Sequence, residues 1–179
     1  MNHKGITVNI LLAEDDDAEF ELARQVFERS RLSARLTRFV NGAELLDFLL
    51  DRGRHAGRAI DKSRPCLILL DMNMPEMGGR ETLKTLKSHP ALRKLPVIML
   101  TNSGDQEDVI GAYDLGVNSF IRKPLTFGEF VEVVNALKLF WFDVAELPAP
   151  LDLPGRDESE KSYAPSGHTR SSSSSSKPK

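Results

Sequence analysis

The chain is poor in cysteine, with one residue in 179, and its formal net charge is only −2. A single cysteine, Cys66, excludes an intrachain disulfide and a zinc site built from several thiolates. No apolar run approaches the roughly 20 residues that span a bilayer, and no secretory signal core precedes the first acidic cluster. The near-neutral charge gives no reason to expect nucleic-acid binding. We therefore expect a cytoplasmic protein with neither membrane nor nucleic acid as a partner.

Short apolar runs alternate with helix-like stretches along most of the sequence. The strand-like runs cover residues 6–13, 35–40, 66–70, 96–100 and 117–121. The helix-like stretches cover about 18–30, 43–51, 80–88, 105–115 and 127–145, with Asp17 expected to cap the first of them and Gly116 to end the fourth. This alternation predicts β–α units and a parallel sheet. We expect one doubly wound α/β domain over residues 1–147.

Two segments differ from this pattern. Residues 148–179 are rich in Ser, Pro and Gly and include six consecutive serines at 171–176. Such a composition cannot bury enough apolar surface to offset its ordering entropy, so we expect a disordered tail. Residues 52–64 carry several basic side chains and are interpreted as a solvated loop.

Polar residues stand at the ends of four apolar runs. In chain order they are Glu14, Asp15, Asp71, Thr101 and Lys123. The carboxyl ends of parallel strands meet at one edge of the sheet, where such sheets hold ligands. Carboxylate oxygens are the hard ligands that Mg²⁺ prefers, and an ammonium can neutralise phosphoryl oxygens. The pattern predicts a site that binds Mg²⁺ and a phosphoryl group together.

Asp71 is the predicted nucleophile of this site, because a carboxylate can attack phosphorus to form an acyl phosphate. Lys123 would neutralise charge on the phosphoryl group, and the hydroxyl of Thr101 would hold another of its oxygens. Taken singly, an aspartate could cap a turn and a lysine could be an ordinary surface residue. Their combination in this order favours the phosphoryl site.

In combination these residues resemble the receiver-domain signature of two-component response regulators. Asp71 lies 30 residues before Thr101, and Thr101 lies 22 residues before Lys123-Pro124, which matches that family's pattern. Several segments are similar to those of single-domain, CheY-like regulators that partner phytochrome-type sensor kinases: residues 10–15, 41–49, 69–75, 113–120 and 140–141. The resemblance implies a five-stranded sheet in the order 2-1-3-4-5.

The resemblance also implies a phosphorylation cycle instead of an enzyme that turns over substrate. A sensor histidine kinase or a histidine phosphotransfer protein would donate the phosphoryl group to Asp71. Mg²⁺ would be held by Glu14, Asp15, Asp71 and the backbone carbonyl of Asn73. Thr101 and Phe120 would then move and alter the face formed by the fourth helix, fifth strand and fifth helix. The Lys123–Pro124 peptide bond is expected to be cis.

Two positions depart from the family's commonest pattern. Phe120 stands where tyrosine is frequent, so it can swing inward but cannot donate a hydroxyl hydrogen bond. Asn102 follows Thr101 where a small residue is common, and its size is expected to restrict access of water and small phosphodonors to Asp71.

Two other functions would use parts of the same site. Dehalogenase-type phosphatases also combine an aspartate nucleophile, Mg²⁺ and a lysine, but their nucleophile follows the first strand and a second acid lies two residues on. Here Asp71 follows the third strand, and Asn73 stands at the second position. A degenerate receiver used only for binding is disfavoured by the intact acidic cluster.

The last predicted helix, over 127–145, has an unusually wide apolar face. Projected on a helical wheel, its apolar arc is about 200° wide, against roughly 100° for a helix that packs on one surface. Phe140, Trp141 and Phe142 are adjacent and point about 100° apart, so they cannot all face one core. We expect a homodimer through this helix, the strand over 117–121 and the helix over 105–115. The alternative is that the tail folds back over this surface.

Overall fold

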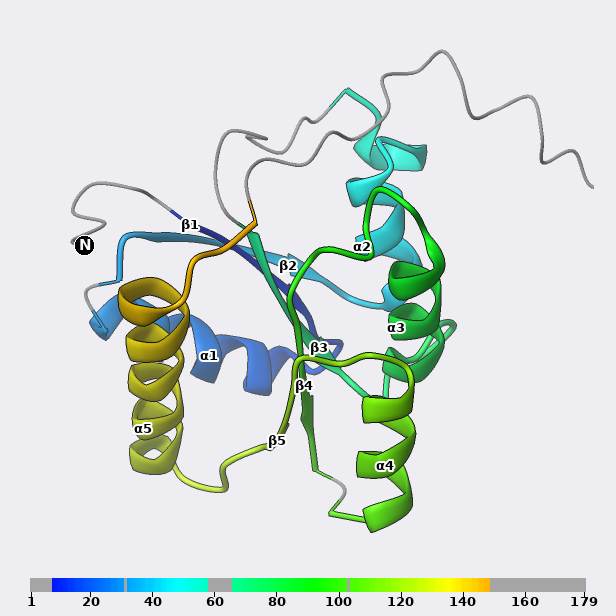
Figure 1. The fold of residues 1–179 in the computed structure, drawn as a ribbon. Coiled ribbons are helices and arrows are strands. Elements are labelled where there is room, and N and C mark those ends of the chain that lie inside the picture. The colour runs from blue at the N-terminus through cyan, green and yellow to red at the C-terminus, as the bar shows by residue number, and fades with distance from the viewer. Residues whose placement is uncertain (1–7, 31, 58–65, 103, 149–179) are drawn as a thin grey trace, which may run out of the picture.

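The five apolar runs form one parallel sheet in the computed structural model, which describes residues 8–30, 32–57, 66–102 and 104–148 (Figure 1). The strands are β1 (Val8–Ala13), β2 (Ala34–Phe39), β3 (Cys66–Asp71), β4 (Val97–Thr101) and β5 (Ser119–Arg122). Their order, β2-β1-β3-β4-β5, is the predicted one. Every residue of β1, β3 and β4 is buried, because a parallel sheet is covered by helices on both faces.

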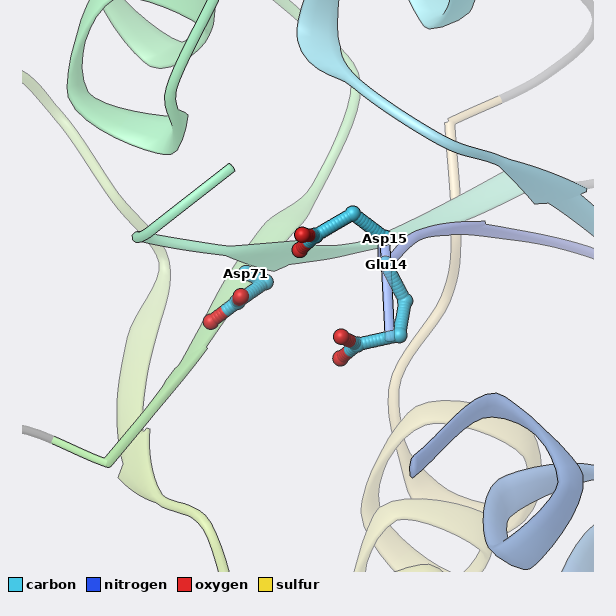
Figure 2. A group of neighbouring side chains, drawn as sticks. All are labelled: Glu14, Asp15 and Asp71. Atoms are coloured by element: carbon cyan, nitrogen blue, oxygen red, sulfur yellow. The ribbon is translucent and has the colours of Figure 1, made fainter. Parts of the chain in front are cut away.

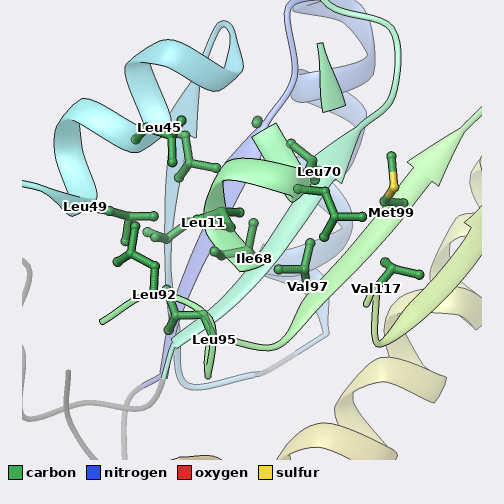
Figure 3. Packing of buried hydrophobic residues seen from close by; sticks show 14 of the residues in the cluster. Leu11, Leu45, Leu49, Ile68, Leu70, Leu92, Leu95, Val97, Met99 and Val117 are labelled. Carbon is green, nitrogen blue, oxygen red and sulfur yellow. The ribbon is translucent and has the colours of Figure 1, made fainter. Parts of the chain in front are cut away.

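Helices cover both faces of the sheet (Figure 1). One face carries α1 (Asp17–Arg29) and α5 (Phe127–Lys138), and the other carries α2 (Gly42–Leu49), α3 (Gly79–Ser88) and α4 (Gln106–Asp114). Successive strand residues point to opposite faces. Leu11 and Ile68 therefore pack with Leu45 on the α2 side (Figure 3), whereas Ile10 and Leu69 join the core under α1 and α5.

The register between strands brings their carboxyl ends to one level. Ala13 lies opposite Leu70 in the β1–β3 pair, and Asp71 lies opposite Leu100 in the β3–β4 pair. Thr101 lies opposite Arg122 in the β4–β5 pair. The residues that follow these positions therefore meet at the same edge of the sheet, as the sequence predicts.

Some predicted boundaries shift by one residue or fall outside the described part of the chain. The cap of α1 is Asp16 instead of Asp17, because its carboxylate accepts hydrogen bonds from the amides of Ala18 and Glu19, both at 2.8 Å. Gly116 follows the C-cap of α4 with a φ of 86°, so it ends that helix as predicted. The expected strand start at 6–7, the loop residues 58–64 and nearly all of the expected tail, 149–179, lie outside the described residues.

The last helix changes its geometry before it ends. The regular turns of α5 stop at Lys138, and a π-helical segment, η2 (Leu139–Val144), continues the chain. The amide of Ala145 donates to the carbonyl of Phe140 at 2.7 Å, the i→i+5 bond of such a segment. A helical wheel with regular spacing therefore does not describe this end of the helix. No helix within the described ranges has both the length and the apolar character needed to cross a bilayer.

The prediction of a cis Lys123–Pro124 bond is wrong, since every peptide bond in the described residues is trans. The amide of Lys123 donates to the carbonyl of Thr101 at 2.7 Å, which continues the β4–β5 pairing by one residue. From this backbone position the four-carbon lysine side chain is long enough to extend to the end of β1.

The predicted solvated loop after α2 begins with a short helical turn, η1 (Gly53–His55), and the prediction is wrong for His55. That side chain is buried, with its ring centroid 5.9 Å from the ring of Phe39 and 5.5 Å from that of Phe48. Its Nε2 lies 3.1 Å from Oε1 of Glu44. Aromatic contacts and a carboxylate partner explain why this polar ring lies in the interior.

Candidate functional site

Three carboxylates converge at the carboxyl edge of the sheet (Figure 2). Glu14 and Asp15 follow β1 directly, and Asp71 ends β3. One oxygen atom from each lies within 4.8 Å of the others. Glu14 and Asp71 are buried, with 3% and 5% of their surface exposed, while Asp15 is exposed. A set of oxygen ligands with one side open to solvent fits a hard divalent cation that keeps some water ligands.

Lys123 brings an ammonium group to the same cluster. Its Nζ lies 2.7 Å from Oε2 of Glu14 and 3.1 Å from Oδ1 of Asp71, and it also contacts Oε2 of Glu19. A lysine ammonium has three hydrogens to donate, and here three carboxylates surround it. The lysine thus occupies the place that the sequence predicted, whereas Glu19 is a partner that the sequence analysis missed.

Burial and charge act against each other in this cluster. Burial raises the pKa of Glu14 to about 7, although the hydrogen bond and charge of Lys123 oppose the shift. Burial also raises the pKa of the Asp71 carboxyl, and Lys123 again opposes it. Burial alone would lower the pKa of Lys123, but its hydrogen bonds to Glu14 and Glu19 raise it above its ordinary value. The ammonium stays charged. A further cation would reduce the repulsion among the neighbouring carboxylates.

Backbone packing holds Asp71 in place. A Cβ atom built on Gly79, the first residue of α3, would lie 2.2 Å from the carbonyl oxygen of Asp71, so a side chain there would collide with the site. The amide of Gly79 donates to the carbonyl of Met72 at 2.9 Å. On the neighbouring strand Thr101 is fully buried at the end of β4. The start of α3 therefore packs directly on the backbone of Asp71 and Met72.

The other predicted site residues lie at the margin of this cluster. Asn73 is exposed in the loop two residues beyond Asp71, and Phe120 is half-buried in β5 against the core on the α2 side. The movements of Thr101 and Phe120 and the ligand role of the Asn73 carbonyl stay predictions.

Arg38 is a supporting residue that the sequence analysis did not identify. From the end of β2 it donates to the backbone carbonyls of Glu14, at 2.9 Å, and Asp15, at 2.8 Å. A third hydrogen bond, of 2.6 Å, reaches Oδ1 of Asp17, and the guanidinium lies 4.7 Å from the ring centroid of Phe20. Arg38 therefore fixes the loop that carries the acidic residues.

The predicted interface residues differ sharply in exposure. Phe140 is 53% exposed and Trp141 is half-buried, with their rings in an edge-to-face contact at 5.1 Å. Phe142 is instead buried in the core under α1 and α5. The π-helical segment turns Phe142 inward, so we correct the expected interface to Phe140 and Trp141 without it.

The sheet order, the acidic cluster and the lysine at the end of β5 are together the architecture of a receiver domain. The family model of the response regulator receiver domain matches residues 10–135, and the chain belongs to this family. Receiver domains are signalling proteins and not typical enzymes, which favours this class over the phosphatase considered from the sequence.

Its relatives include phytochrome-associated regulators. The chain is 35% identical over 140 residues to response regulator Rcp1 of Synechocystis. The aligned region covers 78% of this chain and 92% of that protein. The solved structure of the phosphorylated cyanobacterial phytochrome response regulator RcpA is 33% identical, covers 80% of this chain and 99% of its own, and has a TM-score of 0.73. The Mn²⁺-bound form of Rcp1 is 33% identical over 79% of this chain and 99% of that one, with a TM-score of 0.69.

Proposed function

We propose that this protein is a stand-alone phosphoacceptor switch in which Asp71 is the phosphorylated residue. The observation that carries this proposal is the buried Asp71 carboxylate 3.1 Å from the Lys123 ammonium, with oxygens of Glu14 and Asp15 beside it. An oxygen of Asp71 forms a bond to phosphorus while the nitrogen–phosphorus bond of a phosphohistidine breaks. The imidazole leaves with the electron pair, and the product is an acyl phosphate.

The residues around Asp71 suit the charge of the transferred group. We assign Glu14, Asp15, Asp71 and the Asn73 carbonyl to hold Mg²⁺, which when bound neutralises charge on the phosphoryl oxygens. The all-oxygen donor set supports a hard cation, and the similar protein Rcp1 has a Mn²⁺-bound form. Lys123 would pair with one phosphoryl oxygen and the Thr101 hydroxyl with another.

The signal would leave through the face formed by α4, β5 and α5. Within α4 only Ala112 is buried, and an ion pair of 2.9 Å between Arg80 and Asp108 ties this helix to α3. A helix with so little buried surface can shift at small energetic cost. Movement of Thr101 and Phe120 at the adjoining strands would thus change this face, and partners would read the change.

The proposed partners are a sensor histidine kinase of the phytochrome type, or a histidine phosphotransfer protein, and a second copy of the chain. The likeness to a phytochrome response regulator supports the kinase. The exposed Phe140 beside Trp141 supports the homodimer, because a contiguous exposed apolar patch is typical of an interface.

The test is phosphotransfer from a phosphorylated histidine kinase in the presence of Mg²⁺. The wild type should become labelled, and the label should be released by hydroxylamine, which cleaves acyl phosphates. Asp71→Asn should lose the label completely, while Asp114→Asn, at an exposed aspartate of α4, should keep it. A hydroxylamine-resistant label that persists in Asp71→Asn would contradict the proposal.

A further inference from the structure

Three helices share the same pattern at their first turn, a residue whose side chain caps the helix followed three positions later by glutamate. In α2, Asn41 accepts from the amide of Glu44 at 2.8 Å, and the Glu44 carboxylate accepts from the amide of Val40 at 3.0 Å. In α5, Thr126 accepts from the amide of Glu129 at 3.2 Å, and the Glu129 carboxylate accepts from the amide of Thr126 at 3.1 Å. The two bonds of α5 form a capping box, and in α2 the glutamate binds the residue before the cap, so both glutamates bind the backbone at the start of their own helix.

The glutamate of α1 does not complete its cap. Asp16 caps this helix and Glu19 occupies the equivalent position, but the amide of Asp16 donates to Glu14 at 3.2 Å instead. The Glu19 carboxylate reaches Lys123 with one oxygen and accepts from the side-chain amide of Asn102 with the other, at 3.2 Å. Glu19 therefore binds Lys123 and Asn102 at the carboxyl edge of the sheet instead of capping its own helix.

The three carboxylates around Lys123 are not equally easy to release. The side chains of Glu14 and Asp71 are only 5% and 6% exposed, whereas that of Glu19 is 38% exposed. A groove of about 270 Å³ opens beside Lys123 and is lined by Glu19, Asn102 and the apolar side chains of Leu22 and others. Glu19 can therefore move into water or into the groove. Its carboxylate then lies in solvent, so its release leaves no unpaired carboxylate in the interior.

We propose that Glu19 is a placeholder: its carboxylate occupies the position on the Lys123 ammonium that an oxygen of the phosphoryl group takes when Asp71 is phosphorylated. A phosphoryl group on Asp71 brings further negative charge to the ammonium, from which Glu14 and Glu19 already accept hydrogen bonds, so it competes with these two carboxylates for Lys123. Glu19 is the one that leaves. It is a positioning residue that acts through Lys123 and lowers the affinity of the pocket for a phosphoryl oxygen. This inference rests on the proposed phosphoacceptor function.

The test uses beryllofluoride, a tetrahedral anion with the shape of a phosphoryl group, titrated into the full chain at saturating Mg²⁺ and followed by fluorine NMR. We expect Glu19→Gln to bind it roughly fivefold more tightly than the wild type, the size of one partly exposed ion pair. Glu19→Asp keeps the charge but is one methylene too short to hold Lys123, so it should match Glu19→Gln. The control Glu21→Gln, whose glutamate pairs with Arg24 at 2.7 Å, should match the wild type.

The possible outcomes are distinguished by the following comparisons. If Glu19 acts through the ammonium, its substitution should give no gain in a Lys123→Ala background. If Glu19→Asp behaves as the wild type while Glu19→Gln binds more tightly, only the net charge matters and the placeholder is rejected. Equal affinity of the wild type and both Glu19 variants also rejects it. A wild type that binds Mg²⁺ but no beryllofluoride would instead overturn the phosphoacceptor function itself.

Discussion

The carboxyl edge of the sheet and the end of the last helix differ in which residues they bury and which they expose. At the sheet edge, charged groups are buried: Glu14 and Asp71 are at most 5% exposed and share one ammonium. At the end of α5 and in η2, large apolar groups are exposed, with Leu139 at 61%, Phe140 at 53% and Val144 at 69%. Each arrangement is unfavourable for an isolated chain.

The difference indicates what would complete each region. Positive charge reduces the repulsion among the buried carboxylates, and a divalent cation supplies it. The lysine beside them attracts an anion such as a phosphoryl group. Exposed apolar side chains are relieved by another apolar surface. We therefore interpret the sheet edge as the region that changes with ligand and the helix end as the region that changes with association.

Removing the lysine should break the first region most severely. Lys123→Ala leaves Glu14 and Asp71 without their shared cation, and breaking a buried pair in this way costs about 3 kcal/mol of unfolding free energy. Mg²⁺ should restore part of that loss, because it supplies positive charge to the same carboxylates. The variant should keep its fold and Mg²⁺ binding but lose the structural response to phosphorylation.

Urea unfolding in chelator and in Mg²⁺ measures both effects. Lys84→Ala, at an exposed lysine of α3, is the matched control and should unfold as the wild type does in both solutions. A Lys123→Ala variant that is as stable as this control in chelator would show that the ammonium is not needed to stabilise the buried carboxylates.

A charge placed in the second region should abolish association. Phe140→Glu removes an exposed ring from each side of a twofold interface, and the loss of about 1.5 kcal/mol per ring weakens the dimer by about 100-fold. Sedimentation should then show a monomer at micromolar concentration, with Asp71 still phosphorylatable. Leu125→Glu, at a residue that is 89% exposed in the loop before α5, should leave the dimer intact. A wild type that is monomeric both with and without phosphorylation would reject the homodimer.

The fold and most of the acidic site could be predicted because both depend on strand ends. Each apolar run shows where a strand stops, and a parallel sheet brings those ends to one edge. Asp71, Glu14 and Lys123 are therefore found from their positions in the sequence alone. Glu19 and Arg38 are different, because their roles depend on which side chain a neighbouring helix or strand presents to the site.

The errors have physical causes of the same kind. His55 was placed in a solvated loop because its partners, Phe39, Phe48 and Glu44, lie earlier in the chain and meet it only after folding. Regular helical spacing up to residue 145 predicts Phe142 at the interface, whereas the π-helical turns of η2 bury it. Neither a buried polar contact over such separations nor a change to π-helical turns has a signature in local periodicity.

The Glu44 cluster offers a third case, a partly buried charge whose partners all belong to the same chain. Burial alone would raise the pKa of Glu44, but hydrogen bonds from the Val40 amide and from Arg54 outweigh burial and hold it below its ordinary value of 4.5. A carboxyl whose pKa is lowered on folding stabilises the protein above its unfolded pKa. That contribution is lost as the pH falls through the lower folded value.

Glu44→Gln should therefore lower the unfolding free energy by about 1 kcal/mol at pH 7, the size of one typical net hydrogen bond. The difference from the wild type should shrink as the pH falls below about 4, where the wild-type carboxyl also becomes neutral. Unlike Lys123→Ala, the loss should be the same in chelator and in Mg²⁺, because no ligand is needed to complete this cluster. Glu81→Gln, at the exposed equivalent position of α3, is the control in urea unfolding across pH. A Mg²⁺-dependent loss in Glu44→Gln would show that a partly buried charge away from the sheet edge also responds to the cation.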